Sequence, residues 1–269
     1  MKKTISIIAA AAITGAFVFS ACKDGKKGND EDITIPTLQA AQVAGMQVDT
    51  VTFNASDGLE VTGVVYCADT NAPVIVLCHQ ARFNNYEYAE TAPRLVALGF
   101  TCLAIDQRSG GDMESHINAT NKRAVEKNLP TGYTNSLPDI SAAVNYASER
   151  FHKQVILWGS SYSAALTLKV AMENPNVRAA VGFSPILKFD SGESAADIFK
   201  NYKDKPLFVT STEKEGAPIA KALSHLGDDV LYQYYPETKG THGSKALWSS
   251  DPSSTYYWEE ITKWLNAHK

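Results

Sequence analysis

A serine within a run of small residues is the first group whose spacing suits covalent chemistry. The run reads Gly159-Ser160-Ser161-Tyr162-Ser163. It follows an apolar stretch at residues 155–158, typical of a buried strand, and opens a stretch predicted to be helical at residues 161–173. A sharp strand-to-helix turn presents its side chain for attack and needs small neighbours two positions away. We therefore predict that Ser161 is a nucleophile; the alternative is a simple Ser/Gly helix cap.

A serine hydroxyl is a weak nucleophile unless a base removes its proton. Thr241-His242-Gly243 falls between the last predicted strand, residues 230–235, and the final predicted helix, residues 255–268. In a doubly wound sheet the reacting groups lie beyond the carboxyl ends of the strands. We therefore predict that His242 is the base, although a loop histidine at the surface is the simpler alternative. His79 is a rival base, and we expect it to be a structural or oxyanion-loop residue instead.

A carboxylate is needed to orient the imidazole and stabilise its charged form. It should follow the predicted strand at residues 207–210, where the chain reads Ser211-Thr212-Glu213-Lys214-Glu215. We predict that Glu215 is this acid, with Glu213 as the alternative. A solvated charge cluster around Lys214 is the competing interpretation. The chain order would then be serine, acid, histidine.

A tetrahedral intermediate needs two backbone N–H donors aimed at its oxyanion. Tyr162 directly follows the predicted nucleophile, so we expect its N–H to be one donor. The second is expected from Gln80 or Ala81, which follow an apolar strand predicted at residues 74–78. The sequence does not decide between Gln80 and Ala81.

The predicted elements alternate between strand and helix along most of the chain. Asp57-Gly58, between two alternating runs, predicts a β-hairpin at the start of the domain. The later alternation predicts an α/β fold with a mostly parallel, doubly wound sheet, helices on both faces and no large cap domain. A helix is predicted at residues 87–98 and another at 217–226, and residues 106–136 are predicted to form a long functional loop.

Composition limits the functional classes. The chain has 269 residues, of which 44% are hydrophobic and 20% charged, and its formal net charge is −4. No basic cluster suggests a nucleic-acid partner. No His/Cys cluster suggests a metal, and no cofactor is expected. Cys67, Cys78 and Cys102 could pair only in part, since their number is odd.

The first 22 residues have the layout of an export signal. Two lysines precede an apolar run at residues 5–19, and Ser20-Ala21-Cys22 follows. This ending resembles a bacterial lipobox, which implies lipidation of Cys22 and a protein anchored to the bacterial cell envelope, at the outer membrane. We therefore expect a signal peptide at residues 1–21, a tether and lead-in at 22–48 and one catalytic domain at 49–269. An incidental Cys22 after a plain signal peptide or an uncleaved anchor is the alternative.

Two motifs carry a resemblance to a known superfamily. His79-Gln80 follows one predicted strand, and Asp106-Gln107-Arg108-Ser109-Gly110-Gly111 follows the next. With the serine turn they resemble the α/β-hydrolase superfamily, most of all its dienelactone hydrolase-like and esterase-like members without a large cap. The chain departs from the usual pattern at Gln80, Ser109 and Ser163, where glycine is common, and in using Glu as the acid. True dienelactone hydrolases use a cysteine nucleophile, so that activity is not implied.

The resemblance implies hydrolysis of a small-molecule carboxylic ester through an acyl-enzyme, here at a membrane surface. A peptidase, amidase or thioesterase using the same three side chains is one alternative, because the fold does not fix the substrate. A lipoprotein that keeps the fold only to bind a ligand is the other. A base nitrogen far from the Ser161 oxygen would favour the binding protein.

Overall fold

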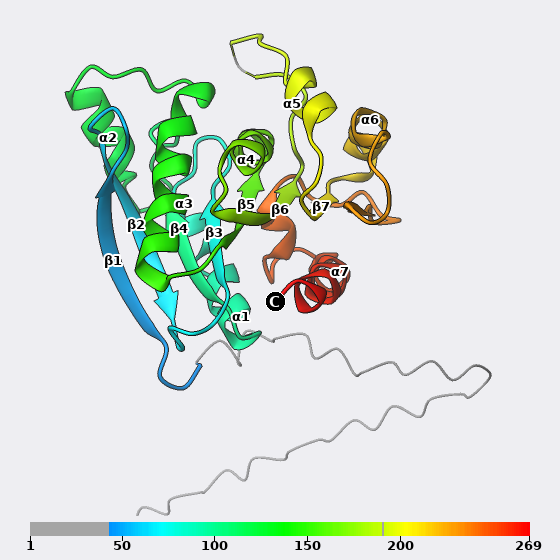
Figure 1. Ribbon diagram of the computed structural model, residues 1–269, viewed down its shortest axis with the longest axis horizontal. Helices are drawn as coiled ribbons and strands as arrows, with labels where there is room; N and C mark the ends of the chain where they lie inside the picture. Colours follow the sequence, from blue (N-terminus) through cyan, green and yellow to red (C-terminus); the bar gives the residue numbers. More distant parts are fainter. Residues whose placement is uncertain (1–42, 190) are drawn as a thin grey trace, which may run out of the picture. The chain divides into compact units, whose positions relative to one another are not determined.

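The computed structural model describes residues 43–189 and 191–269. In this part of the chain the strands form one sheet in the order β1-β2-β4-β3-β5-β6-β7-β8 (Figure 1). The strands are β1 Gln47–Asn54, β2 Glu60–Cys67, β3 Val74–Cys78, β4 Thr101–Ile105, β5 Val155–Ser160, β6 Val177–Phe183, β7 Leu207–Thr210 and β8 Leu231–Tyr234. The pairs β1–β2 and β2–β4 are antiparallel, and all other pairs are parallel. The predicted fold class is confirmed.

The opening hairpin forms where the sequence predicts it. β1 and β2 pair in antiparallel register from Gln47–Cys67 to Asn54–Glu60. Gly58 has a φ of 79°, a left-handed conformation that glycine adopts without steric cost. β1 begins at Gln47 and so extends into the predicted lead-in at residues 22–48.

Helices cover both faces of the sheet. They are α1 Thr91–Ala97, α2 Ala119–Glu126, α3 Leu137–Phe151, α4 Tyr162–Glu173, α5 Ala196–Asn201, α6 Glu213–Leu223 and α7 Ser254–Ala267, with short 3₁₀ turns η2 Asn85–Tyr88, η3 Tyr133–Ser136 and η4 Ser244–Leu247. Alternate residues of β3 point to opposite faces. Val76 packs with α3 and α4, whereas Ile75 packs with α1 and α7.

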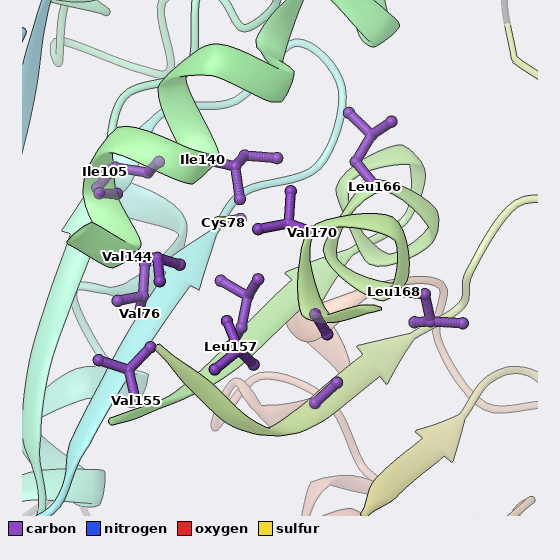
Figure 2. Close-up of a cluster of buried hydrophobic side chains, with 14 of the residues drawn as sticks. Val76, Cys78, Ile105, Ile140, Val144, Val155, Leu157, Leu166, Leu168 and Val170 are labelled. Atoms are coloured by element: carbon purple, nitrogen blue, oxygen red, sulfur yellow. The ribbon is translucent and has the colours of Figure 1, made fainter. Parts of the chain in front are cut away.

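The core on the α3 and α4 face is formed mainly by buried apolar side chains. Figure 2 shows Val76 and Leu157 of the central strands beneath helix residues of this face. Val144 of α3 and Leu166 of α4 are both fully buried. Burial of such side chains contributes roughly 1.5–3 kcal/mol each, so this layer holds β3 and β5 rigidly where their carboxyl ends meet.

Three predicted boundaries are wrong for local reasons. The helix predicted at 87–98 is η2 followed by α1, because Pro93 has no N–H to bond the carbonyl of residue 89. The helix predicted at 217–226 is α6, which begins at Glu213 because Thr212 caps it. The long loop predicted at 106–136 contains α2 and η3.

The predicted signal peptide at residues 1–21, Cys22 and the tether as far as residue 42 lie outside the described residues. Among the helices that are described, none combines the length and apolar character needed to cross a membrane. Cys67, Cys78 and Cys102 are free thiols, and the last two are buried.

Candidate active site

Ser161 lies where β5 turns into α4. Its backbone has a φ of 60° and a ψ of −119°, which is strained for a residue with a side chain. The Ser161 N–H donates to the carbonyl of Phe183 at the end of β6, at 2.8 Å. Such strain persists only where the surroundings impose it, and here it directs the Ser161 side chain away from the core. Ser161 as a whole is 8% exposed.

The two small residues flanking this turn have distinct functions. A Cβ on Gly159 would lie 2.5 Å from the backbone N of Ala164, so no larger residue fits there. Ser163 is fully buried, and its Oγ accepts the N–H of Ser160 at 3.0 Å. The same Oγ lies 2.8 Å from the carbonyl of Cys78 at the end of β3. The serine at the position where glycine is common therefore links the β3 and β5 ends.

Ser161, His242 and Glu215 lie in one hydrogen-bonded line. His242 Nε2 is 2.8 Å from Ser161 Oγ, and His242 Nδ1 is 2.5 Å from Glu215 Oε1. A carboxylate only accepts, so Nδ1 carries the proton and Nε2 is free to accept from the serine hydroxyl. Glu213, the alternative acid, is exposed at the first residue of α6. The structure therefore places Glu215, and not Glu213, on the imidazole.

The start of α6 fixes the carboxylate of Glu215. Its Oε2 accepts the N–H of Thr212 at 3.2 Å, and the Thr212 hydroxyl accepts the N–H of Glu215 at 3.3 Å. Burial raises the pKa of Glu215, but the hydrogen bond from His242 and its positive charge outweigh burial and lower the pKa to about 2. The carboxylate is thus ionised at every pH at which a histidine can act as base.

Glu215→Gln is expected to lower kcat by about 10²–10⁴-fold, because an amide can donate to Nδ1 and stabilise the wrong imidazole tautomer. The measurement is the pH profile of kcat between pH 4 and 9. Since the folded pKa of about 2 lies below the usual 4.5, the wild-type carboxylate stabilises the fold above pH 4.5 and loses this effect as the pH falls through 2. An unchanged kcat would exclude Glu215 as the orienting acid.

The histidine loop requires a glycine next to His242. Gly243 has a φ of 75°, and its N–H donates to Ser184 Oγ at 3.0 Å. A Cβ at this position would lie 2.6 Å from Ser160 Oγ and 2.8 Å from Gln80 Oε1. The loop therefore approaches the ends of β3 and β5 as closely as the backbone allows, which brings the imidazole to the serine.

The predicted oxyanion donors differ in whether their backbone N–H already has a hydrogen-bond partner. Tyr162 is the first residue of α4, where an N–H has no partner within the helix. The N–H of Gln80 donates to Glu87 Oε2 at 2.7 Å and is therefore occupied. No described residue accepts a hydrogen bond from the N–H of Ala81, the other residue that the sequence leaves open, so this N–H can donate to an oxyanion.

His79 is fully buried with both ring nitrogens engaged. Nε2 accepts the N–H of Gln107 at 2.9 Å, so Nδ1 carries the proton and donates to the carbonyl of Gln80 at 2.8 Å. Burial lowers its pKa to about 4. A neutral histidine with no free nitrogen joins the ends of β3 and β4 and is not placed to act as a base.

Sequence reasoning missed a buried ion pair of Arg108 and a buried carboxylate, Glu87, near the site. Arg108 is 2% exposed and pairs with the fully buried Asp139 at 2.6 Å and with Asp57 at 2.5 Å. It is therefore turned into the protein and away from a substrate. Glu87 is also fully buried. Neither could be recognised from the pattern, because Arg108 stands in a polar stretch and Glu87 in a segment predicted to be helical.

The described part of the chain contains no cluster of three or more His, Cys, Asp or Glu residues placed to hold a metal ion. The hydrogen bonds of the site suit proton transfer between Ser161 and His242, with negative charge stabilised by backbone N–H groups.

Solved structures of hydrolases share this fold. The Pyrococcus furiosus esterase Pf2001 superposes with a TM-score of 0.62 at 14% identity, covering 87% of this chain and 95% of the esterase. A dienelactone hydrolase from Anabaena variabilis gives a TM-score of 0.60 at 14% identity over 83% and 98% of the two chains. The Pyrococcus horikoshii acylaminoacyl peptidase gives 0.64 at 15% identity, with 85% of this chain matching 42% of the peptidase. At these identities the likeness shows the fold alone.

Sequence comparison identifies the family. Thiohydrolase ApmlB of Arthrinium phaeospermum is 30% identical over 139 residues, which are 50% of this chain and 42% of the fungal protein. The chain thus matches less than half the length of this curated relative. Residues 69–215, from the turn before β3 to Glu215, match the serine aminopeptidase S33 family. Because that match spans more than half of the chain, the protein belongs to the serine aminopeptidase S33 family of serine-type hydrolases.

Proposed function

We propose that the protein hydrolyses carboxylic esters through an acyl-enzyme, with Ser161 as nucleophile, His242 as base and Glu215 as orienting acid. The observation that carries this proposal is the 2.8 Å separation of His242 Nε2 from Ser161 Oγ. A binding protein that had lost catalysis would have no need to keep a strained serine within a hydrogen bond of an oriented imidazole. The geometry therefore favours an enzyme over the ligand-binding alternative.

The reaction follows from the positions of these groups. The Ser161 proton moves to His242 Nε2 as Oγ bonds to the ester carbonyl carbon, and the carbonyl oxygen becomes an oxyanion. The N–H groups of Ala81 and Tyr162 donate to that oxyanion. His242 then gives its proton to the departing alcohol oxygen, and the carbon–oxygen bond breaks. A water that loses its proton to His242 then bonds to the carbonyl carbon of the acyl-enzyme. The bond from that carbon to Ser161 Oγ breaks, His242 returns the proton to Oγ, and the acid leaves.

Thioester hydrolysis is the second candidate, because the curated relative is named a thiohydrolase. A peptidase activity is the third, supported by the family description and by the fold shared with an acylaminoacyl peptidase. All three acyl substrates would use the same nucleophile and base, and differ only in the leaving atom that His242 must protonate.

A matched set of substrates separates these candidates. The ester, thioester and anilide of one acyl group are offered to the purified protein, and kcat/KM is measured for each. The proposal expects the ester to be cleaved with the highest kcat/KM and the wild-type protein to gain the mass of the acyl group in a rapid-quench experiment. A higher kcat/KM for the thioester or the anilide would reassign the substrate, and no turnover of any of them would contradict the hydrolase.

We further propose that the enzyme acts at a membrane surface of the bacterial cell envelope, through lipid on Cys22. The support is the sequence Ser20-Ala21-Cys22 after the apolar run. Expression of the full chain with labelled palmitate tests this: wild type should carry the label and partition into detergent, and Cys22→Ser should do neither. A wild-type protein without label would contradict the anchor and leave the hydrolase proposal intact.

A further inference from the structure

Glu87 lies behind the candidate active site and contacts its three loops, directly or through one hydroxyl. Its Oε2 accepts the N–H of Gln80 at 2.7 Å, and its Oε1 accepts the hydroxyl proton of Ser160 at 2.8 Å. Ser160 Oγ in turn accepts the N–H of Ser244 at 2.8 Å. One fully buried carboxylate therefore links the end of β3, the end of β5 and the histidine loop.

Each of these partners lies within two residues of a group that the proposed reaction uses. Gln80 precedes Ala81, Ser160 precedes Ser161, and Ser244 follows His242 by two residues. We propose that Glu87 is a positioning residue that holds the oxyanion donor, the nucleophile and the base in register with one another. This proposal rests on the proposed function, since it assigns Glu87 a part in the same reaction.

Further hydrogen bonds hold Glu87 and Ser244 in place. Trp158 Nε1 donates to Ser244 Oγ at 2.9 Å, and Trp248 Nε1 donates to the Glu87 carbonyl at 2.9 Å. The histidine loop also lies against the end of β5, since a Cβ at Gly243 would meet Ser160 Oγ at 2.6 Å. A carboxylate with two acceptor oxygens satisfies both donors at once, which a hydrocarbon side chain cannot do.

Burial makes this carboxylate costly for the fold, which suggests that function retains it. Burial raises the pKa of Glu87 to about 7, although the Gln80 and Ser160 hydrogen bonds and the charges of Lys245 and His242 act in the opposite direction. The pKa of Glu87 is higher in the folded protein than the usual 4.5. Its titration therefore stabilises the fold fully below pH 4.5, and this stabilisation is lost as the pH rises through 7. Tyr88, Lys245 and His242 are the other titratable groups that interact with it or with its cluster.

The test compares Glu87→Gln and Glu87→Ala with wild type and with Glu90→Gln. Glu90 is a matched control, because it lies three residues further on and accepts the N–H of Ser249 at the surface. Active sites are titrated with a phosphonate, so that kcat is expressed per reactive serine. We expect kcat to fall about tenfold in Glu87→Gln and about 100-fold in Glu87→Ala, with KM within about twofold, as for a weakened oxyanion site. Glu90→Gln should match wild type.

Stability and activity should change in opposite directions, which a purely structural carboxylate would not produce. Glu87→Gln removes a charge that costs stability above pH 7, so its Tm at pH 8 should equal or exceed that of wild type while its kcat is reduced. A kcat per titrated site within twofold of wild type in both Glu87 variants would overturn the proposal.

A second readout does not depend on turnover. Hydrogen exchange at the Gln80 and Ser244 amides should become at least about tenfold faster in Glu87→Ala, since both lose protection when the link is removed. Exchange in Glu90→Gln should stay as in wild type. If the wild type hydrolyses no substrate, the proposed function fails. Hydrogen exchange still tests whether Glu87 holds the two loops, and unchanged exchange rates at the Gln80 and Ser244 amides in Glu87→Ala would overturn that proposal.

A cavity beside His242 carries a second, independent inference about the substrate. It has a volume of about 370 Å³ and lies between the loop after β6 and the start of α6. Ile186, Leu187 and Pro218 give it an apolar wall, and Lys188 and Lys214 contribute positive charge. The carboxylate of Glu215 in the same lining is bound to His242. Among the described residues, neither lysine forms a salt bridge.

The chemistry of the leaving group determines what this cavity receives. In the proposed reaction His242 Nε2 protonates the departing oxygen, so the alcohol portion must lie on the His242 side of the scissile bond. We infer that the preferred esters have an apolar alcohol portion that ends in an anionic group, such as a carboxylate. The apolar wall takes the body of the alcohol, and Lys188 and Lys214 bind its charge. This inference rests on the proposed function.

Two esters with similar leaving groups test it: 3-(4-acetoxyphenyl)propanoate and the corresponding neutral propanamide. Wild type should favour the anionic ester about tenfold in kcat/KM, equivalent to about 1.4 kcal/mol, and the preference should shrink with added salt. The double variant Lys188→Met, Lys214→Met should lose the preference, so that its kcat/KM values for the two esters become nearly equal. Lys203→Met, an exposed lysine paired with Asp204, is the control.

Binding of the two product alcohols to the wild type and to the double variant gives a readout without catalysis. The anionic alcohol should bind more tightly than the neutral one, and only to a protein with both lysines. Equal rates and equal binding for anionic and neutral compounds in the wild type would overturn the inference, while hydrolysis of the neutral ester alone would still support the proposed function.

Discussion

His242→Ala is expected to lower kcat/KM for an activated ester by about 10⁴–10⁶-fold, because His242 is the base that the described residues place within hydrogen-bonding distance of Ser161 Oγ. The nucleophile, its strained turn and the backbone donors stay in place, so KM should change much less than kcat. Initial rates with an activated ester of known concentration measure both. Added imidazole should restore part of the rate if only the base is missing.

The control for this variant is His225→Ala. His225 contacts the carbonyl of Tyr202, far along the chain from the serine, and its replacement should leave the rate unchanged. A His242→Ala protein with more than a tenth of the wild-type rate would contradict the assignment of His242. The neighbouring histidine His79 could not take over, since both of its nitrogens are engaged.

Asp139→Ala is expected to give the largest loss of stability, about 3–5 kcal/mol, because it leaves a buried guanidinium without its main partner. Asp139 accepts from the Arg108 N–H at 2.9 Å, from Nε at 3.0 Å and from Nη2 at 2.6 Å. Arg108 is only 2% exposed, so water cannot replace these bonds. Urea unfolding, with the midpoint and slope compared between variant and wild type, measures the change.

Asp57→Ala is the matched comparison for Asp139→Ala. Asp57 binds the same guanidinium, but its side chain is 34% exposed, so water can replace part of its interaction. Its loss should therefore cost clearly less than that of Asp139. Equal effects of the two substitutions, or a loss below about 1 kcal/mol for Asp139→Ala, would show that the buried pair does not hold the β4 end against α3.

The alternation of predicted strands and helices along the chain was sufficient to predict the sheet, and the turn at Asp57-Gly58 to predict its hairpin. The runs at β3, β4 and β5 are apolar throughout, as strands buried on both faces must be. Asp57-Gly58 defined the antiparallel pair because the turn has few alternatives. Strand order and helix boundaries could not be read from the pattern, because they depend on single residues such as Pro93 and on contacts between distant segments.

The candidate site was predictable where chain position decides placement. Ser161 and His242 follow β5 and β8, two parallel strands whose carboxyl ends lie along the same edge of the sheet, so the fold places both residues at that edge. The choice between Glu213 and Glu215 was not fixed in the sequence, because it depends on where α6 begins. Thr212 and Glu215 form a capping box, which starts the helix at Glu213 and directs Glu215 towards the imidazole. That pattern was present in the sequence as Thr-x-x-Glu.

The choice of oxyanion donor depended on a residue that the pattern conceals. Only the contact of Glu87 with the Gln80 N–H removes Gln80 from consideration. A glutamate in a segment predicted to be helical looks like a solvated charge, since burial of Glu is rare unless it is paired. The position of η2 between β3 and the histidine loop, which buries Glu87, is set by tertiary packing alone.

The most direct test of the central claim is labelling of the purified protein with a fluorescent fluorophosphonate, which bonds only to an activated serine. Wild type, Ser161→Ala, Ser160→Ala and His242→Ala are compared after confirming that each is folded. We predict stoichiometric labelling of the wild type on the peptide that contains Ser161, none in Ser161→Ala and a strong reduction in His242→Ala. Ser160→Ala should still be labelled on Ser161, although more slowly, because it loses the link to Glu87. A folded wild type that takes up no label, or labelling that persists in Ser161→Ala, would contradict the account.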